Sequence, residues 1–277
     1  MKPDSVMQMQ TAAPGSPLSV CRVLYYQELG STNAELLERA DMGEPEGTVV
    51  TADAQTAGRG RRGRNWYSPP SQDIYLSILL RPQIPAEKAS GLTLAAAAAV
   101  REAILMNVDR TDPKDDSEKR YRIKWPNDIV ADGKKVCGIL TETRMEDMQI
   151  RAVVVGIGIN VNAPSFPEEI RNIAASLCSV EGKLFDRQQL IRDLLQCFAG
   201  KYALFLQSGD LSGFADEYRF GMAGIGQQVR ISGPAWEKCG ILRGIDASGG
   251  LLLQTEDGRI ENVISGEVSL RGMDAYI

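Results

Sequence analysis

The chain contains no histidine among its 277 residues. That absence excludes Ser-His-Asp and Cys-His catalysis, histidine as a general acid or base, and zinc ligated by histidine. Chemistry in this protein must therefore depend on lysine, arginine, carboxylates, backbone amides and Mg²⁺. Such groups suit phosphoryl or nucleotidyl transfer, in which positioning and charge neutralisation account for most of the catalysis.

Cysteine pairs, a targeting segment and a strongly basic domain are lacking too. The five cysteines are odd in number and none forms a Cys-x-x-Cys pair, so we expect reduced thiols in a cytoplasmic protein. The N-terminal residues have no apolar core of a signal peptide, and we expect no segment that could span a membrane. A net charge of −5 and a pI of about 5.1 argue against a general nucleic-acid-binding protein.

Length and composition predict a globular protein with one large domain, or one large and one small, since 43% of the residues are hydrophobic and 24% are charged. We interpret residues 1–19, rich in Pro, Ser, Gln and Met, as a loose leader. Residues 20–222 mix strand and helix patterns, which predicts an α+β domain with a mixed or antiparallel sheet flanked by helices. In residues 223–277, short apolar runs separated by Gly, Asp and Ser predict a small C-terminal β-barrel.

Periodicity and turn residues place the elements of the larger domain. Thr32 and Glu35 fit a capping box at the start of a helix. Asp132 and Gly133 indicate a hairpin turn within the apolar run from 129 to 145. The other expected strands cover residues 21–29, 47–53, 74–80, 121–124 and 149–161, and the other helices cover residues 86–106 and 186–206.

The segment from Gly58 to Trp66 reads GRGRRGRNW, and its four arginines run against the acidic composition of the whole chain. Glycines in this segment disfavour a helix and let backbone amides approach a ligand closely. The guanidinium fork of arginine matches the oxygens of phosphate and carboxylate groups. The segment therefore predicts an anion-binding loop, which fits a phosphate-bearing intermediate or a nucleic acid.

A second polar segment reads KWPND, from Lys124 to Asp128. Its proline forces an extended turn, after which an amide and a carboxylate follow a lysine. A plain β-turn with Asn and Asp as turn formers explains the same residues. The predicted hairpin brings Lys135 back to this neighbourhood, however, and two lysines beside one carboxylate favour a functional site.

Two further motifs have a structural and a functional interpretation. Residues 156–160 read GIGIN and resemble half of a dinucleotide-binding fingerprint, but the third glycine and a following helix are missing. Close approach of the backbone to a ligand, or a bulge at a strand end, fits this motif better. Ser31, Thr32 and Asn33 suit a helix cap, and a helix N-terminus also binds polar ligands.

The order of these motifs resembles that of the biotin protein ligases, also called biotin–[acetyl-CoA-carboxylase] ligases. The series runs GSTN, Gln55, GRGRRGRNW, KWPND, KKVCGIL and GIGINVN between residues 25 and 162, and GEVSLR at residues 266–271 resembles the end of the family. The resemblance implies a catalytic domain like that of the class II synthetases. It also implies two reactions: biotin and ATP, with Mg²⁺, give biotinyl-5′-adenylate, and biotin then passes to a lysine of a biotin carboxyl carrier domain.

The resemblance also implies roles for individual residues. Catalysis would depend on Lys135, which bridges carboxylate and α-phosphate, on Asp128, which orients or deprotonates the acceptor lysine, and on Arg61. Gly156 and Gly158 would approach the ligand through their backbone. The implied biotin-binding residues are Ser31, Thr32, Asn33, Gln55, Arg59, Gly60, Arg61 and Lys135. The implied nucleotide- or adenylate-binding residues are Arg59, Arg61, Arg62, Arg64, Trp66, Lys124, Asn127 and Asn160, and no metal ligand is implied.

Some members of this family carry an N-terminal helix-turn-helix domain and repress transcription. Only about 20 residues precede the first expected strand, too few for such a domain, so we expect a ligase without specific DNA binding. Family members dimerise through sheet edges, but the sequence leaves the oligomeric state and the acceptor carboxylase open.

Three other functions compete with this interpretation. A lipoate or octanoate ligase or transferase shares the fold, but the Arg/Gly loop and the absence of histidine argue against it. A nucleic-acid-binding protein is disfavoured by the acidic pI of about 5.1 and the single short basic run. A sensor that only binds biotin is disfavoured by the presence of Lys135, Asp128 and the whole arginine loop.

Overall fold

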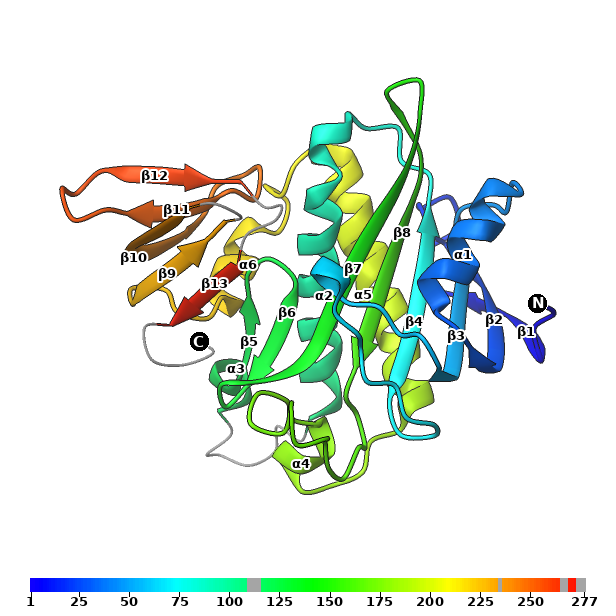
Figure 1. The fold of residues 1–277 in the computed structure, drawn as a ribbon. Coiled ribbons are helices and arrows are strands. Elements are labelled where there is room, and N and C mark those ends of the chain that lie inside the picture. The colour runs from blue at the N-terminus through cyan, green and yellow to red at the C-terminus, as the bar shows by residue number, and fades with distance from the viewer. Residues whose placement is uncertain (109–115, 234–235, 265–268, 273–277) are drawn as a thin grey trace.

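The computed structural model describes residues 1–108, 116–233, 236–264 and 269–272. Its larger part consists of one sheet with helices on both faces (Figure 1). The strands of this sheet are β1 (Ser5–Gln10), β2 (Val20–Leu29), β3 (Thr48–Gln55), β4 (Ile74–Leu80), β5 (Tyr121–Lys124), β6 (Asp128–Ala131), β7 (Lys134–Glu146) and β8 (Gln149–Ile159). The helices are α1 (Thr32–Asp41), α2 (Ser90–Asn107), α3 (Ser117–Arg120), α4 (Leu177–Glu181), α5 (Arg187–Ser208) and α6 (Ala215–Gly221).

The sheet order is β1-β2-β3-β4-β8-β7-β6-β5, and every pairing is antiparallel except the parallel pair β2–β3. Helix α1 forms the crossover that this parallel pair requires. The expected hairpin turn is confirmed, since Asp132 and Gly133 both take positive φ between β6 and β7. The prediction of a mixed sheet flanked by helices is thus confirmed.

The two faces of the sheet bury different helices. Even-numbered residues of β4 pack with α2 and α5 in the main core, whereas Leu79 packs with Leu36 and Leu37 of α1 in a second core. All seven residues of β4 are therefore buried, which explains its uninterrupted apolar run IYLSILL. The site described below lies on the α1 face.

Two expectations about these elements were wrong. Residues 5–10 are not a loose leader but form β1, which pairs antiparallel with β2. Helix α1 has no capping box, because Glu35 contacts Tyr26 and Arg39 instead. Residues Ala86–Asn107 are long and apolar enough to span a membrane by length and composition alone, but 72% of an 18-residue window within them is buried inside the protein, as expected of a core helix.

A second sheet follows α6 and consists of antiparallel strands in the region where a β-barrel was predicted. Its order is β12-β11-β10-β9-β13, and Figure 1 shows it beyond the β5 edge of the large sheet. Of the GEVSLR segment, residues 266–268 lie outside the described part, and Ser269 begins β13. The strands are β9 (Gln228–Ser232), β10 (Glu237–Ile245), β11 (Leu251–Gln254), β12 (Ile260–Val263) and β13 (Ser269–Gly272).

Candidate active site

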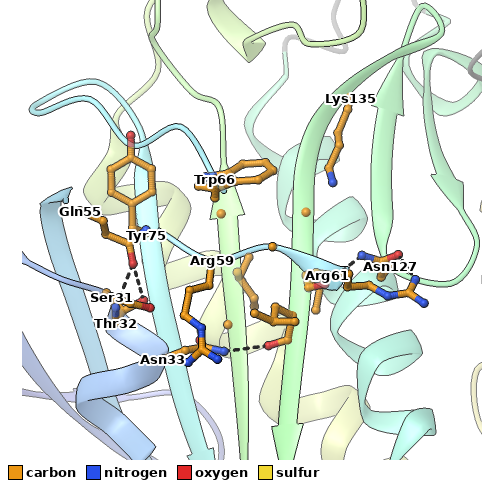
Figure 2. Close-up of a pocket in the computed structure, with 17 residues that line it drawn as sticks. Ser31, Thr32, Asn33, Gln55, Arg59, Arg61, Trp66, Tyr75, Asn127 and Lys135 are labelled. Atoms are coloured by element: carbon orange, nitrogen blue, oxygen red, sulfur yellow. Dashed lines mark hydrogen bonds between the residues drawn. The ribbon is translucent and has the colours of Figure 1, made fainter. Parts of the chain in front are cut away.

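A pocket of about 430 Å³ opens on the α1 face of the large sheet. Its walls are formed by the start of α1, the end of β3 and the Gly58–Trp66 loop, together with the start of β4, the first half of β7 and the end of β8 (Figure 2). The predicted site residues that line it are Ser31, Thr32, Asn33, Gln55, Arg59, Gly60, Arg61, Trp66, Asn127, Lys135, Gly156 and Gly158. Segments more than a hundred residues apart in the chain therefore meet at one cavity.

Strand register explains how these residues meet. Across the sheet, Tyr75 pairs with Gly158, Gly158 with Gly138, Gly138 with Asp128, and Asp128 with Lys124. Side chains in such a row point to the same face of the sheet. The row therefore runs from an aromatic wall, over two glycines, to a carboxylate and an amine.

Glycines form the floor of the pocket because other side chains lie directly on them. A Cβ at Gly158 would come within 2.6 Å of the Trp66 ring, and one at Gly138 within 2.8 Å of Lys135 Nζ. A Cβ at Gly156 would lie 1.9 Å from Asn33 Oδ1. The glycines of the GIGIN motif thus allow other groups to approach the backbone closely. The expected group was a ligand, whereas in this structure the groups are the side chains of Asn33 and Trp66.

Helix α1 presents its N-terminus to the pocket. The backbone N–H of Thr32 donates to Gln55 Oε1 at 2.9 Å, and Gln55 Nε2 donates to Ser68 Oγ at 2.9 Å. Gln55 therefore supplies the cap that the predicted capping box does not. Ser77 Oγ lies 2.8 Å from Thr32 Oγ1 and 2.6 Å from Asn33 Oδ1, which ties the helix start to β4.

The Gly58–Trp66 loop is a small hairpin. The N–H of Trp66 donates to the Gly58 carbonyl at 2.9 Å, and that of Gly60 donates to the Arg64 carbonyl at 2.7 Å. At its tip Arg62 has a φ of 58°, and this residue lines neither the pocket nor the cavity beside it. The loop is thus an ordered wall of the pocket.

Alternate arginines of this hairpin point to different ends of the pocket (Figure 2). Arg61 donates from NH1 to Asn127 Oδ1 at 2.7 Å, which ties the loop to the KWPND segment. Arg59 NH2 lies 3.0 Å from Glu142 Oε1, beside Asn33. Burial lowers the pKa of Arg61, while the nearby Asp128 carboxylate opposes that shift.

Lys135 and Asp128 form the centre of charge at the other end. Lys135 Nζ lies 2.7 Å from Asp128 Oδ1 and 5.1 Å from the centre of the Trp66 ring, in a cation–π contact. Trp66 Nε1 is buried and has no hydrogen-bond partner within the described part of the chain. The tryptophan therefore covers the lysine, with its indole nitrogen lying against Gly158.

Lys124 lies one strand beyond Asp128 and is only 5% exposed. Burial lowers its pKa to about 7, although Asp128 pulls the other way. Neither Lys124 nor Asp128 lines the pocket wall; Asp128 contacts it through Lys135, and Lys124 pairs with Asp128 along the strands.

A second cavity of about 830 Å³ adjoins the first at Arg61, Trp66 and Lys135. It is lined by Arg64 and Asn160, together with the apolar side chains of Phe166 and Ile170. The Asn160 amide donates to the carbonyls of Lys135 and Ala175, so its amide nitrogen already holds the backbone of this wall. Arg271, from β13 of the second sheet, reaches the same cavity.

Sequence reasoning missed Ser68, Tyr75, Ser77 and Glu142. Ser77 and Glu142 lie within strands predicted only as apolar runs. Ser68 lies just after the Gly58–Trp66 loop, and Tyr75 lies at the start of β4. Glu142 shares the parity of Gly138 and Leu140 along β7, so strand alternation could have found it. No group of three Cys, Asp or Glu residues able to hold a metal ion occurs in the described ranges.

Comparisons with known proteins place the chain in a family. Residues 26–160 match the Biotin/lipoate A/B protein ligase family, and residues 224–271 match the Biotin protein ligase C terminal domain. The bifunctional ligase/repressor BirA of Bacillus subtilis is 38% identical over 90% of this chain and 74% of its own length. The biotin–[acetyl-CoA-carboxylase] ligase of Mycobacterium tuberculosis is 34% identical over 87% of this chain and 86% of its own.

A solved structure agrees over nearly the whole chain. Biotin protein ligase from Aquifex aeolicus, in complex with biotin and ATP, superposes with a TM-score of 0.74 at 31% identity. The match covers 90% of this chain and 98% of the other. With the glycine-floored pocket, the Lys135–Asp128 pair and the arginine hairpin, these matches show that the chain belongs to the biotin protein ligase family of enzymes.

Proposed function

We propose that this chain makes biotinyl-5′-adenylate from biotin and ATP and then transfers biotin to one lysine of a biotin carboxyl carrier domain. One observation carries the proposal: Lys135, Asp128 and Arg61 gather at one end of a pocket whose other end is the polar start of α1. A ligand with a polar ring at one end and a carboxylate at the other fits that arrangement.

In the first step a biotin carboxylate oxygen attacks the α-phosphorus of ATP, and the bond from that phosphorus to pyrophosphate breaks. Lys135 and Arg61 would neutralise the negative charge that builds up on the carboxylate and phosphate oxygens. Mg²⁺ would neutralise the triphosphate further. Because Asp128 is already paired with Lys135, such an ion would be held largely by the phosphates.

The adenylate would extend from the first cavity into the second. Gly60, Arg61 and Trp66 line both cavities along this passage, and Arg64 lines the second. The apolar Phe166 and Ile170 suit an adenine ring. Lys124, Asn127 and Asn160 support this compartment, with Asn160 acting through the backbone that it holds.

In the second step the amine of the carrier lysine attacks the acyl carbon of the adenylate, and the bond from that carbon to the phosphate oxygen breaks to release AMP. The attacking amine must lose a proton. Asp128 is the carboxylate beside Lys135, 2.7 Å from its amine, and would orient the incoming lysine or accept that proton.

Biotin-dependent exchange between ATP and pyrophosphate tests the proposal, with lipoate and octanoate in parallel. We expect exchange with biotin alone. Exchange with lipoate or octanoate instead would favour the alternative ligase activity, and no exchange with any of the three acids would refute adenylate formation.

The related BirA proteins are named as repressors as well as ligases. Because the chain is acidic, with a net charge of −5, we expect these residues by themselves to bind no operator DNA. An electrophoretic mobility shift with biotin-operon DNA, biotin and ATP checks this expectation, and a specific shift would contradict it.

A further inference from the structure

The end of the pocket at the start of α1, which would hold the ring of the ligand, is called the ring end. Among the described residues that contact it, through Asn33 and Arg59, Glu142 is the one carboxylate. Both of its oxygens have a partner: Oε2 accepts from Asn33 Nδ2 at 2.8 Å, and Oε1 lies 3.0 Å from Arg59 NH2. One side chain therefore joins the start of α1 to the arginine hairpin across the pocket.

The Asn33 amide is fully committed to this arrangement. Its nitrogen donates to the Leu140 carbonyl at 3.1 Å as well as to Glu142, and its oxygen lies 2.6 Å from Ser77 Oγ. An amide nitrogen has two hydrogens, so neither is left for a ligand. Asn33 thus holds Glu142 in place beside the glycine floor of the pocket.

Position along the strands separates Glu142 from the reacting groups. Asn33 lies on Gly156, whereas Trp66 and Lys135 lie on Gly158 and its partner Gly138. Two residues along a strand amount to about 7 Å. Figure 2 shows Arg59 reaching toward Asn33, while Arg61 turns away toward Asn127.

We propose that Glu142 is a positioning residue that holds Arg59 over the ring end of the biotin pocket, so that Arg59 retains the ring and does not bind the carboxylate. The inference rests on the proposed function. It leaves the substrate carboxylate to Arg61 and Lys135, and it reassigns Arg59, for which the family resemblance implied an anion-binding role.

Charge explains the arrangement. Arg59 is half exposed at the pocket rim, and a bound carboxylate at the Lys135 end would have to draw it away from Glu142. Leaving Glu142 without its partner would cost free energy, because an unpaired carboxylate would remain beside the occupied pocket. The ion pair is therefore kept when the ligand binds.

A comparison of biotin with biotinol, in which an uncharged alcohol replaces the carboxyl group, tests the inference by calorimetry. Arg59→Ala and Glu142→Ala should each raise the Kd of both ligands by about tenfold, the usual weight of a hydrogen bond to a charged group. The double variant should lose no more than either single one, because both residues act as a unit. Steady-state exchange should show a raised KM for biotin at nearly unchanged kcat.

Three results would overturn the inference: loss of affinity in Arg59→Ala for biotin but not biotinol, unchanged or tighter biotin binding in Glu142→Ala, or additive losses in the double variant. Glu142→Gln keeps the shape and the contact with Asn33, so its Kd should rise even where Glu142→Ala folds poorly. Arg144→Ala is the matched control, since Arg144 also ties β7 to α1, through Asp41 at 3.3 Å, but lies outside the pocket.

The same experiment distinguishes this inference from the proposed function. A wild-type protein that neither binds biotin nor supports biotin-dependent exchange would refute both. A wild-type protein that does both, with any of the three results named above, would refute the assignment of Glu142 alone.

Discussion

Single residues divide the positive charge of the site into two sets. Arg59 is neutralised by Glu142 at the ring end, whereas Lys135 and Arg61 meet at the reacting end. Lys135 is further constrained by Asp128 and by the Trp66 ring. A cation fixed from two sides needs little rearrangement when charge develops on the substrate, which is the condition for effective electrostatic catalysis.

Lys135→Ala should therefore slow adenylate formation by about 100-fold or more, the effect of removing one preorganised donor of this kind. Because the lysine side chain is partly exposed, the melting temperature should change little. Pyrophosphate exchange and circular dichroism measure the two quantities. Lys134→Ala, one residue earlier and exposed, should keep the wild-type rate, and equal rates in both variants would contradict the role of Lys135.

The lowered pKa of Lys124 predicts that the free energy of unfolding depends on pH. Its pKa is about 7 in the folded protein and near 10.5 when unfolded, so between these values the unfolded chain binds a proton that the folded chain does not. The contribution of Lys124 to the free energy of unfolding therefore rises with pH between these two pKa values, by at most about 1.4 kcal/mol per pH unit. Urea unfolding from pH 6.5 to 9.5 should show that rise in the wild type and a smaller one in Lys124→Met. Parallel curves for the two proteins would show that Lys124 does not titrate there.

Candidate site residues could be predicted from the sequence where they lie in a loop or at the end of a strand. Lys124, Asp128, Lys135 and the arginines were predicted in this way. Ser77 and Glu142 were not, because alternation along a strand shows only which face a residue shares, whereas the register between strands sets its neighbours. Register depends on long-range pairing that one sequence does not display.

Among the elements, the arginine hairpin is the one most directly tied to the proposed reaction. Its backbone pairs between Gly58 and Trp66, while Arg61 fastens its middle to Asn127. Opening it would expose the adenylate to water and to other amines. Retention of the intermediate should therefore depend on Arg61.

Arg61→Gly should still form adenylate, more slowly, but release it, so that lysines of an unrelated protein become biotinylated. Mass spectrometry of serum albumin incubated with the enzyme, biotin and ATP measures this leakage. Arg62→Gly is a matched control, since Arg62 already has the positive φ that glycine tolerates and lines neither cavity. Leakage from the control equal to that from Arg61→Gly would argue against a specific clamp.

Most helices and strands were predictable because their periodicity reflects one or two buried faces. Strand β4 and the β6–β7 hairpin followed the expected pattern closely. Strand β1 did not, since its residues are mostly exposed and its polar composition resembles that of a loop. It is held by backbone pairing with β2, which does not require apolar side chains.

At the scale of the whole molecule, the second sheet shares a core with the catalytic part. Buried residues of β9, β10 and β11 belong to the same apolar cluster as α2 and α5. Trp125 Nε1, in the KWPND segment, donates to the Gly249 carbonyl at 3.0 Å, and a Cβ at Gly249 would lie within 3.0 Å of Leu94 and Leu211. Residues 223–277 were expected to form a separate small domain, and we propose instead that they unfold together with residues 20–222.

A chain ending at residue 223 should therefore be strongly destabilised, because it exposes Trp125 and part of α2 and leaves the indole N–H without its acceptor. Removal of residues 1–10, whose side chains are mostly exposed, is the matched deletion and should cost much less. Urea unfolding of the full chain, followed by tryptophan fluorescence and by far-ultraviolet circular dichroism, should give one coincident transition. Two separate transitions, or a shortened chain as stable as the full one, would show that the second sheet folds independently and that its contact with Trp125 contributes little to the stability of the site.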